Sequence, residues 1–282
     1  MHTCTMATIM MAVSLTVIGC GGSADLPTSA TQPEEAVTIP VQALINNDIA
    51  AFLKFVAPAE DYAEMQQNWS QAAGDMDPAA KGMINGIIGN LDNPDTIENT
   101  IMPMVEAHLS EIDPEESAAG IQMMGGFMLM GLTGADPQAA EQAKEMLDAL
   151  AEHIRTCGIN DVDKARTAIN TIANAITKAG ISSVDDIASL PFESAMKKLS
   201  PVFGAIKEAA NVYGFDINGV LRSIKVTASG EGDSRDLSVS GTILGKPFTV
   251  PATVVKVGGQ WQIDDGDDSE GFDDDFDFDD ED

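Results

Sequence analysis

The chain has 282 residues, of which 44% are hydrophobic, so it is long enough and apolar enough to bury a sizeable core. Its 15 Lys and Arg face 45 Asp and Glu, which gives a formal net charge of −30. This balance excludes a surface that follows nucleic-acid phosphates, because such surfaces need clustered cations.

The first segment is typical of a secretion signal that ends in a cysteine destined for lipid. The run Ile9–Ile18 is apolar or small except at Ser14 and Thr16, which is the length of a signal-peptide core and too short to span a membrane as a helix. It ends in Val17-Ile18-Gly19-Cys20, which resembles the bacterial lipobox. The resemblance implies cleavage between Gly19 and Cys20 and acylation of the Cys20 thiol.

We therefore expect a signal peptide over residues 1–19, and a lipidated cysteine with a flexible spacer over residues 20–39. The expected partner is the membrane, through lipid on Cys20, and the expected location is the cell envelope. The outer membrane is favoured in an organism with two membranes, because Gly21 is not the aspartate that resembles a retention signal. Since no Lys or Arg precedes the apolar run, an uncleaved anchor and a soluble secretory signal remain open.

Helical periodicity dominates residues 40–222 and predicts about eight to ten helices. The first is expected from Pro40, with a break at Asn46-Asn47-Asp48. Four further starts are marked by an acid or amide followed by proline, because such a side chain caps free amides and proline suits the first helical position. The four pairs are Asp77-Pro78, Asn93-Pro94, Asp113-Pro114 and Asp136-Pro137.

The segment Ile121–Leu132 is apolar on nearly every side, with Gln122 as its polar exception. Such a helix is typical of the centre of a core, and twelve residues are too few to span a bilayer. We expect it in the middle of the helical body, with its glycines allowing close helix approach. If the protein carries an apolar ligand, the predicted cavity is lined by Met124, Phe127 and Met128.

From Ile224 the apolar period changes to two, which predicts four antiparallel strands within residues 223–264, packed on the helices. Gly258-Gly259 predicts a hairpin turn, and Pro251 predicts an edge or bulge in the third strand. The expected class is therefore α+β. The closing residues GGQWQIDD resemble the last strands of nuclear-transport-factor-like and cystatin-like sheets. The helical stretches VQALINNDIAAFLKFVAPAEDYAEMQQNW and AANVYGFDINGVL resemble uncharacterised bacterial envelope lipoproteins, which imply no activity.

The tail over residues 265–282 is acidic, with Phe272, Phe276 and Phe278 among aspartates, and is expected to be disordered. A basic envelope protein or diffusely bound calcium are its candidate partners, with a plainly solvated tail as the simpler interpretation.

Catalytic chemistry finds little support in the sequence. His153 and Cys157 are four residues apart, as a thiol–imidazole pair requires, but Cys157 lies in an apolar stripe and no third group orients the pair. The scattered His108, His153 and Cys157 are too few for a zinc site, and the methionines are explained as core filling. We expect no catalytic residue, metal or cofactor. The leading hypothesis is a non-catalytic envelope lipoprotein that binds or scaffolds another component; alternatives are a carrier of an apolar ligand and, third, an enzyme.

Overall fold

The computed structural model describes residues 26–74, 76–132 and 137–264. Its elements follow one another as α2 (Glu35–Ile45), α3 (Ile49–Val56), α4 (Ala59–Gly74), α5 (Pro78–Leu91), α6 (Pro94–Thr96), η1 (Ile97–Ile101), α7 (Met102–Leu109), α8 (Pro114–Leu132), α9 (Pro137–Thr156), α10 (Val162–Lys178), α11 (Val184–Ala188), α12 (Phe192–Val212), α13 (Ile217–Ser223), β1 (Lys225–Ser229), β2 (Ser234–Ile243), β3 (Lys246–Val257) and β4 (Gln260–Ile263). The predicted α+β class is confirmed. Counting α6, η1 and α7 as one continuous helix, the described residues form eleven helices, one more than the upper end of the expected range.

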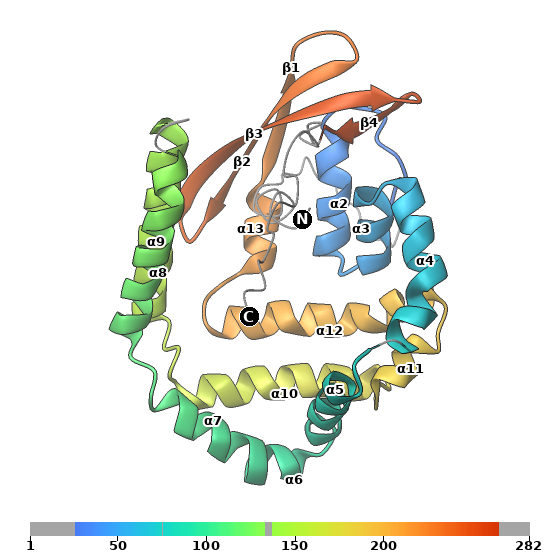
Figure 1. Ribbon diagram of the computed structural model, residues 1–282. Coiled ribbons are helices and arrows are strands. Elements are labelled where there is room, and N and C mark those ends of the chain that lie inside the picture. Colours follow the sequence, from blue (N-terminus) through green and yellow to red (C-terminus); the bar gives the residue numbers. More distant parts are fainter. Residues whose placement is uncertain (1–25, 75, 133–136, 265–282) are drawn as a thin grey trace, which may run out of the picture.

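The helices form an open arc that begins under the sheet and returns to it (Figure 1). α2 and α3 lie beneath the sheet, and α4 and α5 lead away from it. The long helices α10 and α12 lie side by side across the body, and α6 and α7 lie beyond α10, farthest from the sheet. α8 and α9 form a hairpin that reaches back to β3. The chain then passes through α13 into the sheet.

The predicted helix starts are confirmed at all four prolines, and the three pairs that are described in full also show the predicted side-chain cap. The Asp77 carboxylate accepts a hydrogen bond from the Ala80 amide at 2.9 Å. Asn93 and Asp113 cap the next two starts in the same way, through oxygens 2.9 and 2.8 Å from the amide nitrogen two residues further on. α9 also begins at its proline, Pro137, although Asp136 lies outside the described residues.

The four strands form an antiparallel meander in sequence order. Gly258 and Gly259 have φ values of +60° and +86°, so the predicted two-residue turn between β3 and β4 is confirmed. Within β3, only Val254–Val257 pair with β4. Pro251 therefore lies where β3 has β2 on one side and no strand on the other, which confirms the predicted edge position within the described residues.

One face of the sheet is covered by helices, as the alternating pattern predicts. Val37 and Val41 of α2 and Leu221 of α13 pack with Ile224 against this face. Full burial of such a side chain stabilises the fold by roughly 1.5–3 kcal/mol. The sheet residues of this core are Leu237, Val239, Ile243, Phe248, Val254 and Trp261.

The predicted flexible spacer over residues 20–39 is wrong for its described part. α2 begins at Glu35, five residues before Pro40, and Pro40 lies inside the helix. Ala30 is buried, and its carbonyl oxygen accepts a hydrogen bond from the Trp261 amide at 3.0 Å. Packing of apolar residues on both sides of Pro40 outweighs the backbone hydrogen bond that the proline removes. The folded body thus includes Ala30.

Side chains and backbone from the helical part occupy the edges of the sheet. On β1, the Ala228 amide donates to the Glu34 carboxylate at 3.3 Å. On the open stretch of β3, the side-chain amide of Gln142 in α9 donates to the Thr249 carbonyl at 3.0 Å and accepts from the Thr249 amide at 2.9 Å. The Gln142 side chain thus replaces a neighbouring strand, and it fastens the α8–α9 hairpin to the sheet.

Lys207 of α12 connects α2 and α13 through hydrogen bonds. Its side chain is buried, with 3% exposure, and its ammonium donates to the Leu44 carbonyl at 2.6 Å and to the Asn218 side chain at 2.8 Å. Burial lowers the pKa of Lys207 from its usual value, and the nearby Arg222 charge lowers it further. The hydrogen bonds link the C-terminal end of α2 to α13 through a residue of α12.

The apolar segment Ile121–Leu132 forms the C-terminal part of α8, and the prediction that it occupies the middle of the body is wrong. α8 packs mainly against α9, and Met123 and Met124 are about two-thirds exposed. The predicted close helix approach does occur at Gly125, where a Cβ atom would lie 2.4 Å from a Leu147 methyl carbon. Apolar composition indicates a preference for burial, but the number of neighbouring elements decides how much of the helix is covered.

Candidate functional site

Of the residues predicted to carry function, the structure describes the side chain of Met124 alone. Gly19 and Cys20 lie outside the described residues, as do the side chains of Phe127 and Met128. Met124 is 65% exposed and lines neither of the two pockets described below. The candidate site lies elsewhere, in a pocket between α4, α5, α11 and α12, which we call the Trp69 pocket.

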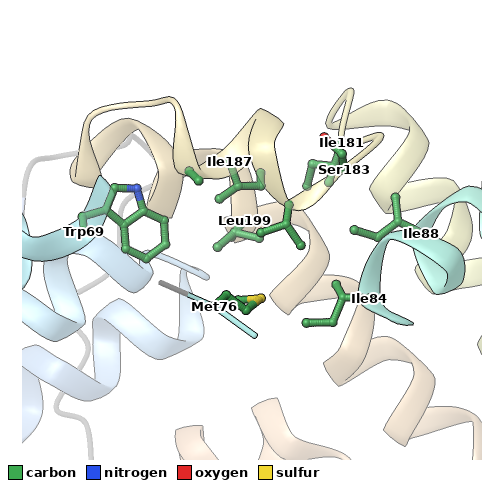
Figure 2. Close-up of a pocket in the computed structure, with 10 residues that line it drawn as sticks. Trp69, Met76, Ile84, Ile88, Ile181, Ser183, Ile187 and Leu199 are labelled. Carbon is green, nitrogen blue, oxygen red and sulfur yellow. The ribbon is translucent and has the colours of Figure 1, made fainter. Parts of the chain in front are cut away.

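The Trp69 pocket has a volume of about 310 Å³ and an almost wholly apolar lining. Figure 2 shows Trp69 at one end, Ile84 and Ile88 of α5 at the other, and Met76 and Leu199 between them. Ser183 supplies the single hydroxyl group among the lining side chains. The full lining consists of Trp69, Met76, Ile84, Ile88, Ile181, Ser183, Val184, Ile187, Ala188 and Leu199.

The short helix α11 is held in place by a capping box. Ser183 accepts from the Asp186 amide, while the Asp186 carboxylate accepts from the Ser182 hydroxyl at 2.5 Å and from the Ser183 amide at 3.0 Å. These hydrogen bonds lower the pKa of Asp186, with the Ser182 hydroxyl making the largest contribution. The cap fixes the direction in which Val184 and Ile187 enter the pocket.

Two polar contacts attach α5 to α11. The Asn85 side chain accepts from the Val184 amide at 2.8 Å, and Lys81 pairs with Asp185 at 2.6 Å. Because the Lys81–Asp185 pair is exposed to solvent on the aspartate side, its contribution is small, at about 0–1 kcal/mol. α5 has no buried residue, so these contacts and the pocket-facing isoleucines hold it on the body.

Three aromatic rings pack together at one end of the pocket. The Phe192 ring lies edge-to-face with both Tyr62 and Trp69, at centroid distances of 5.6 and 5.5 Å. Burial raises the pKa of Tyr62, and the neighbouring Glu193 raises it further. The Trp69 indole nitrogen is buried and has no hydrogen-bond partner among the described residues. A buried N–H without a partner costs roughly 1–3 kcal/mol.

A second pocket, of about 320 Å³, lies where the segment 28–30, α2, α3 and β4 meet. We call it the β4 groove. Its lining is mostly apolar and includes Phe52, Phe55 and Trp261, and its single ionisable residue is Lys54. The groove differs from the Trp69 pocket, whose lining side chains include no ionisable group.

Catalytic and metal chemistry gain no support from the described residues. The His153 ring packs near Phe215, while the Cys157 thiol donates to the Ile154 carbonyl, so the structure does not show the two side chains as a catalytic pair. His108 lies exposed on α7. Within the described part of the chain, no three His, Cys, Asp or Glu side chains are placed to hold a metal ion.

The sequence of α5 indicates part of the Trp69 pocket, although helical periodicity alone does not identify it. The helix from Pro78 to Leu91 places isoleucines at 84, 87 and 88 among glycines, with no broad polar face opposite them. Such a helix needs apolar neighbours on more than one side, yet most of the other lining residues lie about 100 positions later in the chain. Their meeting is set by tertiary structure.

In the part of the chain that the structure describes, no helix combines the length and the hydropathy needed to cross a membrane. Comparisons of the chain with models of protein families, with curated proteins and with solved structures give no match.

Proposed function

We propose that the protein is a lipid-anchored, non-catalytic binding protein of the bacterial cell envelope, and that its body holds an apolar group in the Trp69 pocket. The observation that carries the binding role is the pocket itself: about 310 Å³ of apolar space without an ionisable lining group. Ligand pockets of small molecules begin at about this size. The lining offers no acid, base or nucleophile apart from Ser183, so it is suited to binding.

The ligand class follows from the lining. A charged group would lose its hydration without gaining a partner, whereas an acyl chain would lose only contact with water. Ser183 provides the one hydroxyl among the lining side chains, and this hydroxyl can donate to an ester or amide carbonyl at one end of the chain. We therefore expect an uncharged acyl chain with a carbonyl at its head.

The anchor rests on Val17-Ile18-Gly19-Cys20 and the apolar run before it. Two or more acyl chains on Cys20 would give stable attachment without help from charge. Attraction to anionic head groups is not available to a chain of net charge −30. A tethered body with an acyl-binding pocket could hold lipid close to the membrane to which it is attached.

The binding role is tested with the uncharged fluorophore N-phenyl-1-naphthylamine and a matched pair of variants. Ile84→Trp fills the pocket, whereas Ile87→Trp adds the same ring to the same helix at an exposed position outside it. We expect Ile84→Trp to weaken binding at least about tenfold and Ile87→Trp to change it less than about twofold. Circular dichroism checks that both variants fold. Equal binding to both variants would overturn the assignment of the pocket.

The anchor is tested separately by intact mass and membrane fractionation of the native protein and a Cys20→Ser variant. We expect the native protein to carry acyl mass and to sediment with membranes, and the variant to lack both properties. If both proteins stay soluble and begin at another residue, the lipoprotein assignment is wrong, while the pocket assignment stands.

A second candidate is a scaffold that binds another envelope protein through α5. Met83 and Ile87 on this helix are 65% and 52% exposed, beside pocket residues Ile84 and Ile88. Together they extend the apolar surface from the pocket to the exposed side of α5, and exposed apolar patches mark protein interaction sites. In that case Ile87→Trp would disrupt partner binding as strongly as Ile84→Trp, and lipid extracts of the purified protein would be empty.

A further inference from the structure

The β4 groove is a second pocket among the described residues, and the described chain ends beside it. Its walls come from the segment 28–30, from α2 and α3, and from the residues of β4. Phe52 and Phe55 are half-buried there, so part of each ring is available to an incoming group. Asp264, the last described residue, directly follows Ile263 in the groove wall.

We propose that the β4 groove binds the C-terminal segment of the same chain through Phe272, Phe276 and Phe278 and the aspartates between them. This segment, GFDDDFDFDDED, alternates aromatic and acidic residues. Aromatic rings favour aromatic neighbours in edge-to-face or offset arrangements, and the groove offers Phe52, Phe55 and Trp261. The proposal is independent of the ligand assigned to the Trp69 pocket.

Charge favours this occupant. The chain has three acidic residues for each basic one, yet the groove lining includes Lys54 and no carboxylate. Lys256 and Arg235 lie over the Trp261 ring, with their charged groups 5.7 and 5.9 Å from its centre. None of the three cations forms an ion pair with a carboxylate of the described residues. The Arg235 Nε atom is also buried without a described partner.

The length of the segment allows it to return to the groove. Phe272 lies eight positions after Asp264, and this stretch can span up to ~28 Å when extended. Since the segment is tethered beside its site, its effective concentration there is on the order of millimolar, and weak contacts are enough for occupancy. Thirteen acids in Asp264–Asp282 would otherwise repel one another and the acidic body.

Zero-length carbodiimide cross-linking of the full-length protein tests this contact, because it joins a lysine only to a carboxylate in direct contact. We expect Lys54 and Lys256 to couple to aspartates within 273–277. Replacing Phe272, Phe276 and Phe278 by serine keeps every charge, and we expect it to reduce coupling at least about fivefold. Lys54→Glu should reduce it as well. Lys144→Glu makes the same charge change on an exposed lysine of α9, and we expect it to leave the coupling of the C-terminal segment unchanged.

Hydrogen exchange of the same full-length variants gives a second measurement. We expect the triple serine variant to exchange about threefold faster or more in α3 and β4, with α10 unchanged, because only the groove loses its cover. Coupling spread over all lysines, or unchanged in the triple variant, would overturn the proposal. Cross-links only between chains in a mixture of ¹⁴N and ¹⁵N protein would assign the groove to a second copy. Loss of protection in Cys20→Ser alone would assign it to the acyl chains.

Discussion

The sheet with its covering helices and the helices α5 and α8 have similar apolar contents but very different burial. Ile224 and Val254 in the sheet region are fully buried, and the sheet edges are occupied by Glu34, Ala30 and Gln142. α5 buries no residue, and α8 exposes Met123 and Met124. The difference shows that the apolar composition of a segment determines how much apolar surface is unfavourable in water. The number of neighbouring elements determines how much of that surface becomes buried.

The uncovered apolar surface is also where the candidate site lies. α5 supplies one wall of the Trp69 pocket and exposes Met83 and Ile87 beside it. A region that binds an apolar partner must keep apolar surface accessible. Because α5 has few neighbouring elements, part of its apolar surface remains accessible. The sheet region instead contacts the arc of helices at both of its ends, through α2 and α9 (Figure 1).

The largest expected effect separates the two regions by stability. Ile224→Ala removes a fully buried side chain beside Phe248 and Gly241, and we expect it to lower the free energy of unfolding by about 2–5 kcal/mol. Met124→Ala, at a position 65% exposed, should change it by less than about 0.5 kcal/mol. Urea unfolding followed by circular dichroism measures both. Comparable losses would show that α8 is as closely packed as the sheet.

A smaller effect is expected within the α8–α9 hairpin. Gly125→Val places a side chain where a Cβ atom alone would lie 2.4 Å from Leu147, and such overpacking costs roughly 1–3 kcal/mol. Gly126→Val is the matched control, because a Cβ atom at Gly126 has no neighbour within 4 Å. Hydrogen exchange should show faster opening of α9 in Gly125→Val while β2 stays protected. Adding Leu147→Ala should restore protection, and failure to do so would place the strain elsewhere.

Local features of the fold could be predicted because their physics is local. An aspartate or asparagine before proline satisfies free amides of its own helix, so Asp77, Asn93 and Asp113 marked helix starts without any tertiary information. Gly258-Gly259 identified its turn because few other residues accept two positive φ values in succession. Alternation in β2 likewise marked the buried face.

Contacts between distant segments could not be predicted in this way. The pairing of Ala30 with Trp261 joins the two ends of the described chain, and neither GSADLPTSA nor GGQWQI carries a pattern that specifies it. Pro40 gave a misleading helix start because the packing of α2 on the sheet outweighs the local preference of proline.

The candidate site was the least predictable part. The apolar character of its segment predicts that Met124 lines a cavity. Instead, α8 packs mainly against one neighbour, and the Met124 side chain is exposed. The Trp69 pocket joins α4, α5, α11 and α12, whose meeting depends on contacts such as Asn85 with Val184. Periodicity describes the face of a single helix and contains no information on which faces meet.

The smallest expected effect concerns the wall of the Trp69 pocket and its dependence on pH. Hydrogen bonds from Ser182 and Ser183 lower the pKa of Asp186, so the folded state favours the charged carboxylate. Its stabilising contribution is therefore fully present above the ordinary carboxyl pKa of about 4, and it is lost as the pH falls through the lower pKa of the folded state. We expect the α11 amides to lose protection over that range, and the affinity of the pocket for N-phenyl-1-naphthylamine to fall with it.

Carboxyl-carbon NMR titration measures the pKa of Asp186 directly. Asp186→Asn keeps the shape of the side chain but cannot titrate, so its α11 exchange should be faster than in the native protein at neutral pH and should lack this acid transition. An ordinary pKa for Asp186, or the same acid transition in Asp186→Asn, would show that the capping box does not hold this wall of the pocket.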